Sequence, residues 1–239
     1  RPAVPWSHLA GYGVLIGAGQ FGLLFIAMKS QISPGLASLV VQVQAFFTIG
    51  LSIWFTGEKV RVFQWGALAL AVLGLGVILE HTGGDATPLG LALVVLAALS
   101  WAGGNTVQRA DRPTNMLAYV VWSAVFAIPP LFLLSLVFEG WPAIAHGFEN
   151  ADALTWAAVI YQSVGNTMFG YGSWGYLLSR YPAATVSPTA LLVPVFGMGA
   201  STWFLGESLP PWKIVAALLV MGGLTLNVLW PMLRRPAPA

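Results

Sequence analysis

Hydrophobic and charged residues are segregated along this chain. Eight stretches contain no Asp, Glu, Lys or Arg, and each is long enough for a helix to cross a hydrocarbon core, which takes roughly 17 to 25 residues. They mostly lack the polar stripe at every third or fourth position that a helix of a soluble protein shows. The pattern predicts eight transmembrane helices, at 9–28, 36–56, 63–79, 89–108, 117–138, 153–179, 186–206 and 214–233.

The composition agrees with an all-helical membrane protein. Of the 239 residues, 57% are hydrophobic and 8% are charged, and the mean hydropathy is +0.79. A soluble domain carries about 25% charged residues, so this chain has too few to cover a surface that faces water. The chain has no cysteine, which excludes disulfides and thiolate metal sites.

The basic residues indicate how the helices are oriented. If the connections alternate between two faces, eight of the ten lysines and arginines fall on one face, and only Lys29 and Lys213 fall on the other. Because positively charged connections stay in the cytoplasm, both ends of the chain are predicted to be cytoplasmic. The chain starts at Arg1 without a cleavable signal sequence, and this start is interpreted as a truncation.

An internal repeat appears when the chain is compared with itself at an offset of 149 residues. The run Trp-Phe-x-Gly-Glu that ends at Glu58 recurs at Glu207, and other identities join the same register: Ser38 with Ser187, Phe47 with Phe196, Gly50 with Gly199 and Gly74 with Gly223. In the predicted orientation Glu58 and Glu207 lie on opposite faces, so the repeats are inverted. Inverted repeats place a binding site near the midplane and permit alternating access.

The first three helices repeat as the last three, whereas the fourth and fifth have no counterpart ahead of the first. We therefore expect an all-α transporter of ten helices in two five-helix halves, whose first two helices would precede Arg1. The eight helices of this chain then divide into the remainder of a first repeat, 1–82, and a complete second repeat, 83–235.

Four segments carry a resemblance to a known family: Pro34–Thr48, Ser100–Asn105, Gly170–Gly175 and Leu191–Val195. They resemble the EamA domains of the drug/metabolite transporter superfamily, and within it the exporters of O-acetylserine and cysteine. The stretch Gln-x-Gln-Ala-Phe-Phe-Thr is the most specific part of the likeness. The resemblance implies a ten-helix carrier of the bacterial inner membrane that exports small amino-acid metabolites.

Uncharged polar side chains gather on three of the predicted helices. An unsatisfied polar group in hydrocarbon costs several kcal/mol, so each such residue either lines a watery cavity or bonds to a neighbouring helix, and for any one of them both interpretations stay open. For the whole cluster we favour a cavity that binds a zwitterion, because amides both donate and accept hydrogen bonds. The predicted substrate-binding residues are Gln42, Gln44, Trp101, Asn105, Gln162, Asn166, Tyr171 and Trp174.

Glu58 and Glu207 close two of the predicted helices and are candidates for alternating gates. Each acid could pair with a nearby base, which is Lys59 or Arg61 on one face and Lys213 on the other. An acid at the membrane interface needs no special role, so that alternative stays open.

Other signals predict no catalytic or cofactor site. The glycine pattern from Gly17 to Gly22 lies inside a hydrophobic span, so close packing together with Gly13 is favoured over a dinucleotide fold. No lysine completes a P-loop, and no base accompanies the serines of the spans, which argues against an enzyme. His8, His81 and His146 lie in predicted loops without metal-ligand spacing.

These features favour a secondary transporter that exports small amino-acid metabolites by alternating access. A carrier of another small solute and a non-transporting membrane fragment stay open as alternatives. The expected partners are a zwitterionic metabolite and the lipid bilayer, with no cofactor and no metal. The scattered basic residues exclude a nucleic-acid footprint, and a homodimer is left open.

Overall fold

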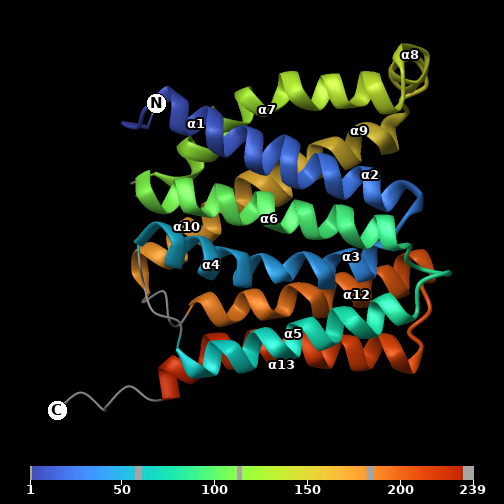
Figure 1. Cartoon of the computed structure of the whole chain (residues 1–239). Helices are drawn as coiled ribbons and strands as arrows, with labels where there is room; N and C mark the ends of the chain where they lie inside the picture. The colour runs from blue at the N-terminus through green and yellow to red at the C-terminus, as the bar shows by residue number, and fades with distance from the viewer. Residues whose placement is uncertain (1, 57–60, 112–114, 182–185, 234–239) are drawn as a thin grey trace.

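The computed structural model describes residues 2–56, 61–111, 115–181 and 186–233. Helices make up nearly all of these ranges and lie side by side in a bundle (Figure 1). In chain order they are α1 (Trp6–Gly13), π-helical η1 (Val14–Gly22), α2 (Leu23–Ser30), α3 (Pro34–Val40), 3₁₀-helical η2 (Val41–Val43), α4 (Gln44–Thr56), α5 (Val62–Glu80), α6 (Pro88–Asp111), α7 (Met116–Phe138), α8 (Trp141–Glu149), α9 (Ala153–Ile160), π-helical η3 (Tyr161–Phe169), α10 (Gly170–Arg180), 3₁₀-helical η4 (Ser187–Leu191), α12 (Leu192–Leu205) and α13 (Pro211–Leu233).

Helical segments occupy all eight predicted ranges, and they show a multi-pass membrane protein. Six are long and apolar enough to cross a membrane: Trp6–Ser30, Pro34–Phe55, Val62–Glu80, Pro88–Asp111, Met116–Phe138 and Pro211–Pro231. The helix Thr189–Leu205 is apolar but shorter. The segment 153–180 contains Gln162, Asn166 and several glycines, and it does not meet the same criterion. Eight crossings therefore stay a prediction.

The helices extend past the charge-free stretches by up to a turn at several ends. The sequence analysis assigned every charged residue to a connection between helices. In the structure, however, Lys29, Arg109 and Lys213 belong to α2, α6 and α13. Elsewhere the ends follow local chemistry. The side chain of Asp152 caps α9 by accepting a hydrogen bond from the Thr155 N–H at 2.7 Å, and Gly206, at φ +68°, ends α12 in the left-handed region.

The α5 and α13 helices pack against each other in antiparallel directions. A Cβ added to Gly74 of α5 would lie 3.1 Å from the carbonyl oxygen of Ala216, and one added to Gly223 of α13 would lie 2.5 Å from that of Ala67. At the 149-residue offset Gly74 corresponds to Gly223 and Ala67 to Ala216. The two close contacts are therefore exchanged by the repeat, which is what a two-fold relation between the halves would produce.

Departures from regular α-helix also recur near the repeat spacing. The π-helical η1 interrupts the first segment and η3 interrupts the segment 153–180, while η2 precedes α4 and η4 precedes α12. A π-helix widens the helical turn and frequently accompanies a functional site. The inverted repeat itself stays a prediction, and these recurrences support it.

Small residues let the first segment approach α7 closely. Side chains added at Gly13 and Gly17 would collide with the Ser123 carbonyl and with the Ala127 side chain, which agrees with the packing role expected for these glycines. The sequence predicted that His8 lies in a loop, but the structure places it in α1. Its Nδ1 is 2.5 Å from Oδ1 of Asp111 at the end of α6, so this pair joins the two helices.

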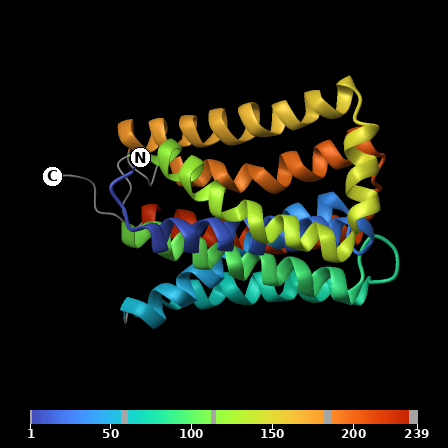
Figure 2. The ribbon, with the colours of Figure 1, turned by 90° about the horizontal axis from the view of Figure 1, so that it is seen from above.

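The segment α9–η3–α10 lies at the edge of the bundle. Figure 2 shows it as the outermost layer, with α7 and α12 nearest to it. Neither α9 nor η3 contains a buried residue, and a Cβ added to Gly175 of α10 would lie 3.3 Å from the Met116 side chain of α7. In Figure 1, α1 begins and α13 ends at the same end of the bundle.

Single cysteines placed in this cysteine-free chain test the crossings. If both 153–180 and 187–205 cross, His146→Cys and Leu209→Cys will react with an impermeant maleimide from outside intact cells, and Tyr181→Cys will react only from the cytoplasmic side. All three positions are exposed. Labelling of Tyr181→Cys from outside would show that the segment 153–180 does not cross.

Candidate functional site

A ladder of polar side chains joins α4 to α6. Gln44, Thr48 and Ser52 stand four residues apart on α4, and Asn105 and Arg109 stand four apart on α6, so each set shares one helix face. The Asn105 Nδ2 donates to Gln44 Oε1 at 3.0 Å and lies 3.5 Å from Thr48 Oγ1. The Arg109 Nη1 donates to Ser52 Oγ at 2.8 Å. We call these five residues the α4–α6 ladder.

The amide groups of the ladder retain hydrogen-bonding capacity. Thr48 Oγ1 donates to the Gln44 backbone oxygen at 2.8 Å, and Gln44 Oε1 already accepts from Asn105. Within the described ranges, neither the Gln44 NH₂ group nor the Asn105 side-chain oxygen has a hydrogen-bond partner. Both side chains are half-buried. The pair therefore offers one donor group and one acceptor to a small polar molecule.

Two of the predicted aromatic residues pack against the hydrophobic core. Trp101, one turn before Asn105 on α6, packs against both of the buried hydrophobic clusters of the bundle. Tyr171 packs against the cluster that contains Leu9, Tyr12 and Tyr119. The sixth helical segment thus contacts this cluster through Tyr171.

The other predicted binding residues lie in different surroundings. Gln42 is buried, and its Nε2 lies 3.4 Å from the Ala190 oxygen of η4, so this amide links α3–α4 to the start of α12. On η3 the Asn166 Nδ2 donates to Gln162 Oε1 at 2.6 Å, and both residues are exposed. Trp174 is half-buried on α10. The structure thus brings Gln44 and Asn105 together, with Trp101 one turn away along α6, whereas Gln162 and Asn166 bond to each other on η3.

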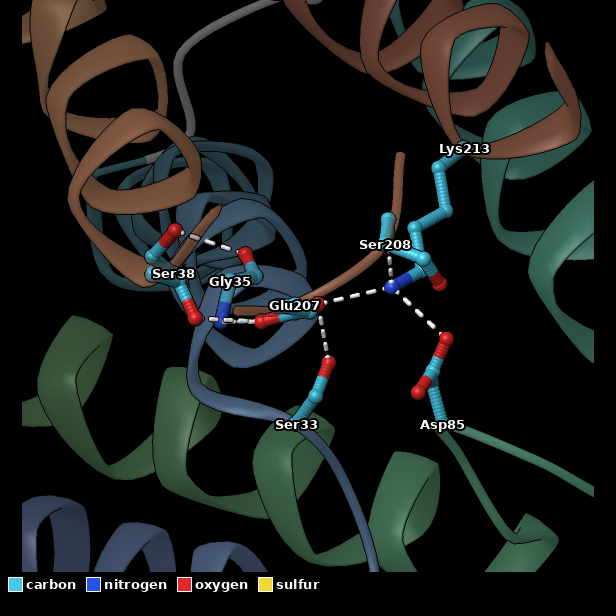
Figure 3. Close-up of polar contacts among 8 residues, drawn as sticks. Ser33, Gly35, Ser38, Asp85, Glu207, Ser208 and Lys213 are labelled. Atoms are coloured by element: carbon cyan, nitrogen blue, oxygen red, sulfur yellow. Dashed lines mark hydrogen bonds and ion pairs between the residues drawn. The ribbon is translucent and has the colours of Figure 1, made fainter. Parts of the chain in front are cut away.

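A second polar group, the Lys213 cluster, lies at one end of the bundle (Figure 3). Its members are Ser33, Gly35, Asp85, Ser201, Glu207 and Lys213. The Lys213 side chain has no exposed surface, and its Nζ lies 2.8 Å from Asp85 Oδ2, 2.8 Å from Glu207 Oε1 and 2.9 Å from the Ser208 oxygen. All three ammonium donors are therefore used.

The Glu207 carboxylate joins α12 to the start of α3. It accepts hydrogen bonds from the Ser33 and Ser201 hydroxyls and from the Gly35 N–H at 3.0 Å. A Cβ on residue 35 would lie 2.7 Å from Glu207 Oε2, so glycine permits this approach. Burial alone would raise the pKa of Glu207, but the hydrogen bonds from Lys213, Ser201, Ser33 and Gly35 outweigh it and hold that pKa below its ordinary value.

Two loops meet at the Lys213 cluster. The Ser33 N–H donates to the backbone oxygen of Asp85 at 2.7 Å, and the Thr87 N–H donates to the backbone oxygen of Gln31 at 2.7 Å. These contacts hold the loop before α3 against the loop before α6, and Lys213 adds α13 to the same assembly. The cluster therefore ties four segments of the chain together at this end of the bundle.

The sequence identified Glu207 and Lys213 as a candidate pair, and the structure brings them into contact. The sequence did not indicate that Lys213 would be fully buried or that Asp85 would contact it, because Lys213 and Asp85 were predicted to lie in two short connections that are far apart in the chain. Glu58, the other candidate gate, lies outside the described residues, as does Lys59.

A separate pocket of about 540 Å³ between α2, α6 and α7 ends at Lys29 and Glu139, whose charged atoms are 3.8 Å apart.

Comparison with known proteins identifies the family. The EamA-like transporter family matches residues 1–80 and 88–229. The chain belongs to this family. The EamA chain is 41% identical to a "probable amino-acid metabolite efflux pump" of Salmonella typhimurium, over 99% of its own length and 81% of the relative's. It is 40% identical to a protein of the same name from Escherichia coli K12, over 95% and 78% of the two chains.

More distant relatives agree. The EamA chain is 28% identical to a "probable terminal-alkyne amino-acid exporter" of Streptantibioticus cattleyicolor, over 92% of this chain and 69% of that one. One solved crystal structure superposes on it with a TM-score of 0.59 at 20% sequence identity, covering 98% of this chain and 80% of the other. That likeness concerns the fold. The protein is thus a multi-pass transporter of the inner membrane.

Removing the cation of the Lys213 cluster will destabilise the EamA fold strongly. Lys213→Met leaves Asp85 and Glu207 facing each other, and loss of one partner from a buried pair costs about 3–5 kcal/mol. Lys29→Met is the matched control, because the exposed Lys29–Glu139 pair contributes at most about 1 kcal/mol. The free energy of unfolding in detergent, followed by tryptophan fluorescence, measures both. Equal losses would contradict the structural role of Lys213.

Acid will weaken the same cluster. Because the pKa of folded Glu207 lies below its ordinary value of 4.5, its contribution to stability is fully present above that value and is lost as the pH falls through the folded pKa. We expect Glu207→Gln to be less stable than wild type at pH 7. As the pH is lowered from 7 to 3, the variant should lose less stability than wild type does. Thermal midpoints measured from pH 7 to pH 3, with exposed Glu149→Gln as control, test this. Parallel curves for wild type and Glu207→Gln would refute it.

Proposed function

We propose that this EamA protein is a secondary transporter that exports small amino-acid metabolites, of the cysteine and O-acetylserine type, across the bacterial inner membrane. The observation that carries the proposal is the half-buried Gln44–Asn105 amide pair in the α4–α6 ladder. The names of the most similar relatives, which describe amino-acid metabolite efflux, point to the same substrate class.

The chemistry of the pair suits a zwitterion. The Gln44 NH₂ group can donate to a carboxylate, and the Asn105 oxygen can accept from an ammonium group. Neither amide carries a net charge, so the empty site costs less in the membrane than a site of charged residues. Trp101 adds an aromatic wall beside Asn105. In this proposal Tyr171, Trp174, Gln42, Gln162 and Asn166 complete the lining in other conformations of the transport cycle.

Alternating access follows from the proposed inverted repeats. The exchanged contacts between α5 and α13, together with the recurring π-helical segments, support two related halves. The Lys213 cluster closes one end of the bundle, and in the orientation proposed from the basic residues that end faces away from the cytoplasm. Glu207 then acts as the gate residue there, and Glu58, outside the described residues, would take the equivalent position at the cytoplasmic end.

Substitution within the amide pair tests the proposal. Uptake of radiolabelled cysteine and O-acetylserine into inside-out vesicles measures export, and Gln44→Ala and Asn105→Ala should each raise KM by roughly tenfold or more, because each removes a hydrogen bond to a charged group. Thr106→Ala is the control, since among the described residues Thr106 donates to the Ala102 oxygen of its own helix.

Two outcomes would count against the proposal in different ways. Wild-type vesicles that take up neither compound would exclude this substrate class. Uptake that is unchanged by both amide substitutions would leave export intact but remove the amide pair from the binding site.

A further inference from the structure

Arg109 continues the polar stripe of α6 beyond the amide pair. Trp101, Asn105 and Arg109 follow one another at intervals of four residues, which correspond to a rise of about 6 Å along the helix. Opposite them, Ser52 ends the matching stripe of α4 and accepts the hydrogen bond from Arg109 Nη1 at 2.8 Å. The guanidinium therefore lies next in line after the Gln44–Asn105 pair, in the last turn of α6.

The guanidinium has no carboxylate partner within the described ranges, where the ion pairs are formed by other residues. A guanidinium has five N–H donors, and the hydrogen bond to Ser52 uses one of them. The residue as a whole is exposed. Arg109 thus combines a permanent positive charge, spare donors in a planar fork, and access from outside the bundle, which are the properties that bind a carboxylate in a bidentate manner.

The Lys213 cluster shows how different this position is. Ser52 and Ser201 correspond to each other at the 149-residue offset. Ser201 donates to a carboxylate that is already paired with a fully buried lysine. At Ser52 the neighbouring base, Arg109, is exposed, and no carboxylate of the described residues contacts it. The two positions thus differ in whether a described carboxylate accompanies the base.

We propose that Arg109 binds the carboxylate of the substrate at the entrance to the α4–α6 ladder and thereby selects amino acids over amines. This rests on the proposed function. The guanidinium balances the charge of one carboxylate, while the ammonium group of the same molecule reaches toward the oxygen of Asn105. The position at the end of α6 suits this role, because a charge near the membrane interface is much cheaper than one at the midplane.

A pair of ligands that differ only in the carboxylate tests the assignment. Cysteine and its decarboxylated counterpart cysteamine are titrated against the purified chain, with binding followed by tryptophan fluorescence, and both are used as competitors of cysteine uptake into inside-out vesicles. A reductant keeps both ligands as thiols, and the protein itself has no cysteine to react.

Arg109→Gln is expected to weaken cysteine binding and raise its KM by roughly tenfold or more, because a charge-assisted hydrogen bond is lost. The affinity for cysteamine should stay unchanged or rise. Arg109→Lys should recover part of the cysteine affinity, because the charge returns without the bidentate geometry. Arg180→Gln is the matched control: Arg180 is also exposed at a helix end, where it lies 5.3 Å from the centre of the Tyr176 ring.

The outcomes separate this assignment from the proposed function. Equal losses for cysteine and cysteamine in Arg109→Gln would mean that Arg109 only braces α6 against α4, and would overturn the assignment while export stands. Unchanged cysteine affinity would overturn it as well. Wild-type protein that neither binds nor transports either ligand would reject the export proposal, and this assignment with it.

Discussion

Hydrocarbon offers no hydrogen-bond partners, and this constraint governs the backbone groups and the polar side chains inside the bundle. Backbone groups are satisfied within helices, and the polar side chains inside the bundle bond to one another or to backbone oxygens, as Ser100 does with the oxygen of Leu15. The described residues leave a single buried side-chain atom without a partner, Thr202 Oγ1. Polar residues in the bundle therefore act as connectors between helices unless they keep spare capacity, and that capacity distinguishes the Gln44–Asn105 pair.

The two ends of the bundle handle charge in opposite ways. Lys213 is fully buried, and its desolvation is offset by two carboxylates and a backbone oxygen with good geometry. Such a network is costly to break in part, which suits a closure that forms or separates as a unit. Arg109 remains at the surface with a neutral partner. A charge held in this way is available to a ligand at little cost, because no ion pair with a carboxylate of the described residues has to be broken first.

Packing of the helices depends on small residues at a few crossing points. Gly74 and Gly223 allow α5 and α13 to approach within contact of each other's backbone, and Gly13 and Gly17 do the same for the first segment against α7. In a bilayer, where lipid tails are as apolar as leucine, close approach supplies much of the attraction between helices. The edge segment α9–η3–α10 makes fewer such contacts and keeps its polar residues exposed.

The sequence by itself determined the helical class, the positions of the helical segments and the family, because exclusion of charge from hydrocarbon is a property of each stretch taken alone. It also indicated Gln44 and Asn105 as polar residues of interest and Glu207 with Lys213 as a pair. Only the tertiary structure decided which amides meet, that Lys213 is buried between Asp85 and Glu207, that His8 pairs with Asp111, and that Arg109 reaches Ser52. Apart from the Lys213–Glu207 pair, these contacts join residues that are far apart in the sequence. Their formation depends on how the helices pack against each other, which no local pattern of residues specifies.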